Sequence, residues 1–164
     1  METYDVAIIG AGVVGSLVAR ELSRYQLQVC LLEKGEDVAV GATRANSAIV
    51  HGGFDPLPGT LKAKLNVRGT VMMPQLAEEL HVPYRRNGSL VVAFSEEEEP
   101  ILGELYRRGV ENGVPGLRLL TAAEALELEP HLSPSAAAAL LCESSGIISP
   151  YELAIAAAGN AMDN

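Results

Sequence analysis

The chain has 164 residues, of which 48% are hydrophobic but only 4% aromatic, and it contains no Trp. This length suffices for one domain with a sizeable core, and a core of Val, Ile, Leu and Ala favours α/β layers over an aromatic-rich β-sandwich. The formal net charge of −9 repels phosphate at long range, which argues against a nucleic-acid partner.

The first residues predict a strand, a glycine-rich turn and a helix. Val6–Ile9 is a short apolar run, Gly10-x-Gly12-x-x-Gly15 follows it, and apolar residues then recur at helical spacing as far as Tyr25. In such a unit Gly10 permits a sharp turn and Gly12 lets the backbone approach a pyrophosphate. Gly15 lets the helix pack close to the strand, and the helix N-terminus offers N–H groups to phosphate.

A second apolar strand, Val29–Leu32, ends at the acidic residue Glu33. A carboxylate at this place can accept hydrogen bonds from ribose hydroxyls. Strand, turn, helix and acid in this order predict a dinucleotide site. The alternative is a glycine-rich turn in an ordinary α/β protein.

A long polar loop and a long helix come next. Residues 35–59 carry little periodicity, and a loop of this length is usually functional. Thr60 is expected to cap a helix that begins at Leu61, with Pro74 as a kink. The apolar side chains expected to point inward from this helix are Leu65, Val71, Met72, Leu76 and Leu80.

The following segment reads as a hairpin and an acidic helix. Residues 81–84 look extended, Asn87-Gly88 is typical of a turn, and residues 89–94 form a strong strand, which together suggest a hairpin. Ser95 is expected to cap a helix that runs to about Glu111. The run of four Glu that follows Ser95 then matches the helix dipole, and we favour this solvated helix start over a metal or interaction site.

The last third predicts three strands and two capped helices. The strands are expected at 117–120, 137–142 and 146–148. Thr121 and Glu124 form a capping box, and Ser149 caps a final helix. The β-rich middle does not continue a strand-helix alternation, so we predict an α/β fold with a cofactor domain at 1–80 and 149–164 and part of a second domain at 81–148. No strand follows the final helix, which suggests the N-terminal part of a longer protein.

Several of these motifs resemble a known family. The glycine pattern followed by Glu33-Lys34-Gly35 resembles the FAD-binding signature of glutathione-reductase-like flavoproteins. Residues 41–54, GATRANSAIVHGGF, resemble the second flavin loop of the D-amino-acid-oxidase type family. Within it, residues 49–53 are similar to FAD-dependent glycerol-3-phosphate dehydrogenases and residues 58–65 to L-2-hydroxyglutarate oxidases and dehydrogenases. One departure is Leu27, where the family usually has Gly.

The resemblance implies a Rossmann-like FAD-binding βαβ domain with an inserted β-rich portion of a substrate domain, in an enzyme of more than twice this length. It implies that the chain alone is inactive. The residues implied to bind FAD are Gly10, Gly12, Val14, Gly15, Glu33, Lys34, Thr43, Arg44, Asn46, Ser47, Gly52 and Gly53. For the polar loop residues among them, the alternative is a loop held by its own Asx and Ser/Thr turns.

His51 is the candidate catalytic residue. By resemblance it would lie near the isoalloxazine, where it would polarise the substrate, act as a base or tether the flavin; the alternative is a structural histidine. Three isolated histidines predict no metal site. Cations that would suit an anionic substrate stand at Lys62, Lys64, Arg68, Arg85 and Arg86, unless they only form a solvated surface.

The function expected from the resemblance is hydride transfer to FAD from a small anionic hydroxyl compound, such as glycerol-3-phosphate or an L-2-hydroxy acid. An amine or amino-acid oxidase of the same fold and a non-catalytic dinucleotide-binding module are the alternatives. An electron-acceptor partner is implied, and self-association is expected if apolar faces are uncovered. No run reaches the ~20 apolar residues of a membrane span. Acidic residues precede the first apolar run where a secretory signal is basic, so a cytoplasmic location is expected.

Overall fold

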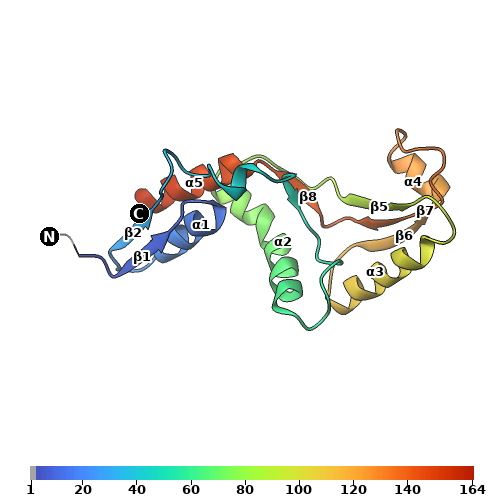
Figure 1. The fold of residues 1–164 in the computed structure, drawn as a ribbon, viewed down its shortest axis with the longest axis horizontal. Helices are drawn as coiled ribbons and strands as arrows, with labels where there is room; N and C mark the ends of the chain where they lie inside the picture. The colour runs from blue at the N-terminus through green and yellow to red at the C-terminus, as the bar shows by residue number, and fades with distance from the viewer. Residues whose placement is uncertain (1–2) are drawn as a thin grey trace. The chain divides into compact units, whose positions relative to one another are not determined.

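A computed structural model describes residues 3–164 of the chain. Helices and strands are mixed along it, which confirms the α/β class (Figure 1). None of the helices in this described part is long and apolar enough to cross a bilayer. The elements in chain order are β1 (Val6–Ile9), α1 (Val13–Leu22), β2 (Val29–Leu32), the 3-10 helix η1 (Ala42–Arg44), β3 (Ile49–Val50), α2 (Leu61–Glu79), β4 (Tyr84–Arg85), β5 (Ser89–Ala93), α3 (Glu99–Glu111), β6 (Leu117–Thr121), α4 (Ala122–Leu128), β7 (Ala138–Cys142), β8 (Gly146–Ile148) and α5 (Pro150–Met162).

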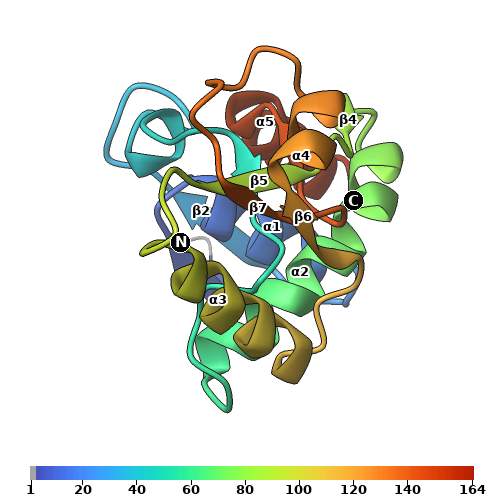
Figure 2. The same ribbon diagram turned by 90° about the vertical axis from the view of Figure 1, so that its right-hand side faces the viewer.

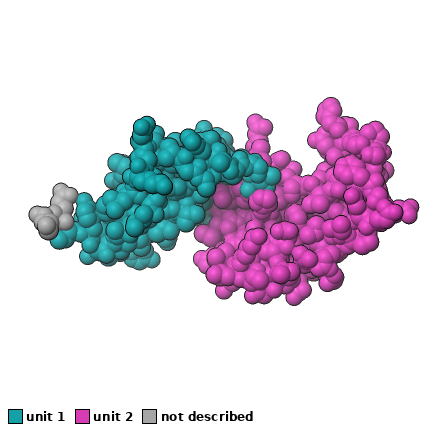
Figure 3. All heavy atoms as spheres, viewed as in Figure 1, with its two compact units in different colours: residues 1–49, 75–84, 148–164 teal, residues 50–74, 85–147 magenta. Residues whose placement is uncertain are grey.

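The chain divides into two compact units (Figure 3). Unit 1 contains the chain up to Ile49 together with residues 75–84 and 148–164. Unit 2 contains residues 50–74 and 85–147. The short strands β3, β8 and β4 pair in that order. The assignment of the cofactor and the substrate to separate domains stays a prediction.

Unit 1 is built from a parallel strand pair and two helices. β1 pairs with β2, with Val6 opposite Val29 at one end and Ile9 opposite Leu32 at the other. α1 packs against α5, which lies beside it in Figure 1. The buried contact uses small side chains, and these allow two helix backbones to approach closely: Ser16, Ala19, Ala154, Ala157 and Ala158. Helix α1 ends at Leu22, so Tyr25 lies outside it, contrary to expectation.

Unit 2 has an antiparallel sheet, in the order β5-β7-β6, between two helices. Figure 2 shows α3 and α4 on opposite sides of this sheet. Side chains alternate along the central strand, as the pleat requires. Leu140 packs with Leu102 of α3, and Ala139 packs with Ala125 of α4. Both faces of the central strand are therefore buried.

The hairpin predicted at residues 81–94 is wrong. β4 and β5 belong to different sheets, and the N–H of Gly88 donates to the Ser145 carbonyl (3.0 Å). The physical reason is that Pro83 lacks an N–H group and the extended run before the turn is short. β7 offers β5 a five-residue apolar partner instead, from Ser89 opposite Cys142 to Ala93 opposite Ala138.

Ser95 does not cap α3, which begins later than expected. The helix starts at Glu99, and the Ser95 carbonyl accepts from the Glu98 N–H (3.1 Å) in a turn that precedes it. A helix beginning at Glu96 would have placed Pro100 in its interior, where the ring clashes with the preceding turn. At the second helical position Pro100 is tolerated.

Helix α2 begins at Leu61 as predicted, and the Thr60 hydroxyl accepts from the Ala63 N–H (3.2 Å). Its inward face is only partly the predicted one. Leu80, just after the helix, is buried and Leu76 is half-buried, but Leu65, Val71 and Met72 are exposed. The buried positions recur every seven residues and carry small side chains, which let a helix pack closely. These positions are Ala63, Thr70 and Ala77.

The predicted caps of the last two helices are confirmed. The Thr121 hydroxyl accepts from the Glu124 N–H (3.3 Å), and Glu124 Oε2 accepts from the Thr121 N–H (2.8 Å), which completes the capping box of α4. The Ser149 hydroxyl accepts from the Glu152 N–H (3.3 Å) at the start of α5.

Candidate functional site

The turn between β1 and α1 has the shape of a phosphate cradle. Gly10 has φ of +99°, a conformation that side chains disfavour, and its N–H donates to the Leu32 carbonyl (2.7 Å). A Cβ atom at Gly15 would overlap the carbonyl oxygen of Gly10, so only glycine lets α1 approach the turn this closely. Val14, also predicted to bind the cofactor, is 74% exposed in the first turn of α1.

Glu33 lies at the end of β2 and joins the cradle. Its Oε1 accepts from the Gly35 N–H and its Oε2 from the Ala11 N–H, both at 2.8 Å. These backbone hydrogen bonds hold the pKa of the Glu33 carboxyl below its usual value, and the bond from Gly35 has the largest effect. A carboxylate has about four acceptor sites, so each oxygen can also accept from a ligand hydroxyl. Lys34, next in the chain, is exposed.

The loop that follows brings Thr43 to the first turn of α1. Thr43 lies in η1, and its Oγ1 accepts from the Val13 N–H (2.9 Å). The first N–H groups of a helix have no partner within it, so this hydroxyl satisfies one of them. A Cβ at Gly12 would come within 3.0 Å of the same hydroxyl oxygen. Thr43 is therefore part of the cradle.

The other polar residues of the loop divide into two groups. Asn46 holds the loop itself, because its Nδ2 donates to the Thr43 carbonyl (2.5 Å) and its Oδ1 accepts from the Ala48 N–H (2.8 Å). The side chains of Arg44 and Ser47 are exposed, so they are accessible to a ligand. Arg44 and Ser47 therefore suit a ligand site, whereas Asn46 suits a loop held by its own hydrogen bonds.

His51, Gly52 and Gly53 belong to unit 2. The His51 carbonyl accepts from the Thr70 hydroxyl (2.5 Å), while its imidazole is exposed. A Cβ at Gly52 would overlap the sulfur of Cys142, and Gly53 has φ of +103°. These close contacts and this hydrogen bond fix the backbone of residues 51–53, which carries the His51 imidazole.

A cavity of about 490 Å³ lies beside His51. Lys62 and Asn66 of α2 line it, together with apolar side chains that include Phe54 and Val91. Asn66 Oδ1 is buried without a hydrogen-bond partner among the described residues. Of the cations proposed from sequence, Lys64 and Arg68 line a different cavity.

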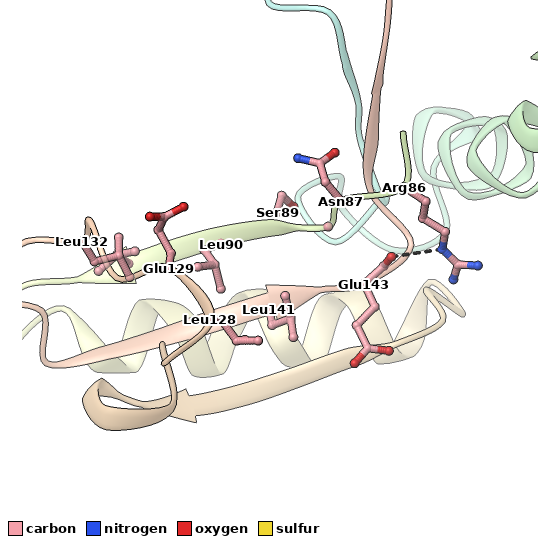
Figure 4. A pocket seen from close by; sticks show the side chains of 11 residues that line it. Arg86, Asn87, Ser89, Leu90, Leu128, Glu129, Leu132, Leu141 and Glu143 are labelled. Carbon is pink, nitrogen blue, oxygen red and sulfur yellow. Dashed lines mark hydrogen bonds between the residues drawn. The ribbon is translucent and has the colours of Figure 1, made fainter. Parts of the chain in front are cut away.

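Another cavity of unit 2, about 530 Å³, lies against β5 and β7 (Figure 4). Leu90 and Leu141 form part of its apolar wall, and Arg86 at its edge donates to the Glu143 carbonyl (3.1 Å). No residue predicted to bind FAD or to act in catalysis lines it. The cradle of unit 1 and the His51 loop of unit 2 stay the two candidate sites, each considered by itself.

Sequence reasoning missed three residues that hold these loops. The Tyr151 hydroxyl donates to the Arg44 carbonyl (3.1 Å), Thr70 holds His51, and Asn112 Nδ2 donates to two carbonyls of the segment after His51. Each of these contacts joins residues far apart in the chain, so no local pattern points to them.

The cradle fits the pyrophosphate and adenosine ribose of a dinucleotide. Gly10 and Gly15 leave room where side chains would fill the turn, and the α1 N-terminus provides N–H groups for phosphate. The Glu33 carboxylate provides hydroxyl acceptors beside it. The donor and acceptor set therefore suits FAD.

Comparisons with known proteins agree with this geometry. Over 161 residues the chain is 52% identical to a glycerol 3-phosphate dehydrogenase of Caloramator mitchellensis, covering 98% of this chain and 34% of that protein. It is 38% identical over 157 residues to a mitochondrial L-2-hydroxyglutarate dehydrogenase of Nematostella vectensis, covering 94% and 34%. The chain thus spans about a third of the length of these relatives, in agreement with the prediction of an N-terminal part.

Solved structures match as well. An L-alpha-glycerophosphate oxidase of Mycoplasma pneumoniae with FAD bound superposes with a TM-score of 0.91 at 37% identity, covering 99% of this chain and 43% of that one. A glycine oxidase of Geobacillus kaustophilus superposes with a TM-score of 0.87 at 31% identity, covering 97% and 44%.

The model of one protein family, described as FAD dependent oxidoreductase, matches residues 5–164. This match confirms the family predicted from the motifs and confirms FAD as the dinucleotide of that family. With its βαβ cradle and its match over nearly every residue, the chain belongs to the DAO family of FAD-dependent oxidoreductases.

Proposed function

We propose that this chain provides the FAD-binding part of an oxidoreductase that oxidises a small anionic hydroxyl compound, glycerol 3-phosphate or an L-2-hydroxy acid. The observation that carries the proposal is the cradle, in which Gly15 closes onto Gly10 and Glu33 bonds to Ala11. The substrate class is supported by the 52% identity to a glycerol 3-phosphate dehydrogenase.

The cradle residues would hold the ADP half of FAD. Glu33 would accept hydrogen bonds from the adenosine ribose, and the glycine turn would admit the pyrophosphate. Thr43, Arg44 and Ser47 would donate to the phosphates and to the linker between phosphate and ring. Lys34 would add a positive charge next to the carboxylate that holds the ribose.

The residues around the His51 cavity would serve the substrate. FAD held by the complete protein would supply the acceptor for the hydride of the substrate carbon. The exposed imidazole of His51 lines this cavity and would accept the proton of the substrate hydroxyl. Lys62, which lines the same cavity, would attract the anionic group.

Anaerobic mixing of the full-length protein with candidate substrates tests this function. We expect a yellow protein whose flavin absorbance bleaches with glycerol 3-phosphate or L-2-hydroxyglutarate and does not bleach with glycine. D-2-hydroxyglutarate is the matched control for the second substrate. A colourless protein that fails to take up FAD would contradict the proposal.

An amine or amino-acid oxidase is the second candidate, and the 31% identity to a glycine oxidase favours it. Bleaching by glycine or another amino acid alone would select it over the first. The electron acceptor and the cytoplasmic location stay predictions. A non-catalytic module would bind FAD without any of these substrates bleaching it.

A further inference from the structure

We propose that Thr70 and Asn112 are positioning residues for His51. Thr70 on α2 and Asn112 at the end of α3 hold the segment 51–56 through its backbone carbonyls. This inference rests on the proposed role of His51. It adds two residues that carry no sequence signal of function.

Thr70 holds the first residue of the segment. Its side chain is only 5% exposed, and its Oγ1 lies 2.5 Å from the His51 carbonyl and 3.1 Å from the Asn66 carbonyl. A hydroxyl has one proton to donate, and a helical Thr ordinarily gives it to the carbonyl four residues earlier. The closer acceptor here is the His51 carbonyl, so the Thr70 hydroxyl donates to the loop instead of to its own helix.

Asn112 holds the other end. Its Nδ2 lies 3.0 Å from the Gly53 carbonyl and 2.8 Å from the Pro56 carbonyl. An amide group has two N–H donors, and each of these carbonyls receives one of them. The two bonds close the segment 53–56 into a fixed turn. Asn112 is itself placed by α3, since its N–H donates to the Arg108 carbonyl (2.8 Å).

Between these anchors the segment has no room to shift. Gly52 lies against Cys142, whose side chain is fully buried. Phe54 lies against Gly109, where an added Cβ would come within 2.9 Å of the Phe54 Cβ. Helices α2 and α3 and strand β7 therefore hold the backbone, while the His51 imidazole stays exposed. A fixed backbone under an accessible side chain is what precise placement of a reacting group requires.

Loss of an anchor should slow catalysis more than it weakens substrate binding. A misplacement of about 1 Å can cost up to ~100-fold in rate. We expect about tenfold for one lost anchor, because the other remains.

The test uses the full-length FAD-loaded protein and four variants. Thr70→Val removes the hydroxyl and keeps the shape, Thr70→Ser keeps the hydroxyl, and Asn112→Asp replaces two donors by acceptors. Thr121→Val is the matched control, because it removes a structural hydroxyl of unit 2 that caps α4. Flavin content, the rate of anaerobic flavin reduction over a range of substrate concentrations, and amide hydrogen exchange of residues 51–56 are measured for each.

We expect Thr70→Val and Asn112→Asp to retain flavin, to slow its reduction about tenfold with little change in KM, and to speed exchange of residues 51–56. Thr70→Ser should restore both readouts, and Thr121→Val should change neither. If residues 51–56 of both Thr70→Val and Asn112→Asp exchange their amide hydrogens as slowly as in the wild type, the inference is overturned whatever the activity of these variants. Faster exchange with an unchanged rate would also overturn it.

A fifth variant, His51→Asn, separates this inference from the proposed function. If His51→Asn reduces its flavin slowly while Thr70→Val and Asn112→Asp reduce it at the wild-type rate, the positioning role is overturned and His51 stays in the mechanism. A His51→Asn as fast as wild type overturns the role of His51 and the positioning role that depends on it. If Thr70→Val does not fold, Asn112→Asp decides by the same two readouts.

Discussion

Single glycines of the cradle are required for different physical reasons. Gly10 is needed for its backbone conformation, since φ of +99° is rare for other residues. Gly15 has an ordinary helical conformation but no free space, because its missing Cβ faces the Gly10 carbonyl. A methyl group at Gly10 would therefore strain the backbone conformation, and one at Gly15 would clash with a neighbouring atom.

Alanine at Gly15 should destabilise the protein. The added Cβ overlaps a backbone atom that cannot rotate away, so α1 has to move, at a cost of about 1–3 kcal/mol in the free energy of unfolding. FAD affinity should fall with it. Gly159→Ala in α5 is the matched control, since nothing lies within 4 Å of its Cβ position, and it should stabilise by ~0.5–1 kcal/mol. Urea unfolding and flavin titration measure both effects, and a Gly15→Ala variant as stable as wild type would refute this account.

Some of the site could be predicted from the sequence, because its chemistry is local. The glycine spacing and Glu33 can be recognised since one βαβ unit contains them all. Thr70 and Asn112 could not be recognised, since they lie 19 and 59 residues from the carbonyls they hold. Thr70 looks like any helical Thr, and Asn112 looks like the end of a helix before Gly113.

Among the elements, the caps of α4 and α5 formed as expected from signals within four residues, whereas the cap predicted at Ser95 did not form. In the two caps that formed, the side chain and its acceptor or donor are three residues apart. The hairpin at Asn87-Gly88 failed because strand pairing is decided by distant partners, and β7 lies some fifty residues further along the chain. The inward face of α2 was misjudged because small residues packed there in place of the larger apolar ones.

The capping box of α4 should make stability depend on pH. Hydrogen bonds from the Thr121 N–H and hydroxyl hold the pKa of Glu124 below its ordinary value of 4.5, with a smaller contribution from Arg118. A lowered pKa means that the stabilisation is fully present above pH 4.5 and is lost as the pH falls through the lowered pKa.

Glu124→Gln should therefore lower Tm at pH 7 and lower it less at pH ~3, where a larger fraction of Glu124 is protonated. Glu127→Gln is the control on the same helix, outside the box. Thermal unfolding followed by circular dichroism at the two pH values measures the difference. An equal loss at both would mean that the charge of Glu124 contributes nothing.

The whole chain leaves an unusual amount of apolar surface uncovered around its first sheet. Ile9 is 88% exposed and Leu32, its partner across the strand pair, is 51% exposed. A sheet of two strands is marginally stable, and its unpaired edges invite another chain.

We expect the 164-residue chain to self-associate as its concentration rises. Sedimentation should show a weight-average mass that increases with concentration, and Ile9→Thr with Leu32→Thr should reduce the increase by removing apolar surface. Val110→Thr, at an exposed apolar position on α3, is the control and should change little. A chain that stays monomeric at every concentration would show that these faces do not associate.

The packing of α1 against α5 has a consequence for how the protein is made. Arg20 and Asn160 share a hydrogen bond across 140 residues. At roughly 5–20 residues per second, the ribosome takes on the order of 10 s to deliver the second helix after the first. During that interval α1 lacks its packing partner α5, and every segment of unit 2 is made before α5. The inserted unit can therefore fold before α1 and α5 have packed together in its host.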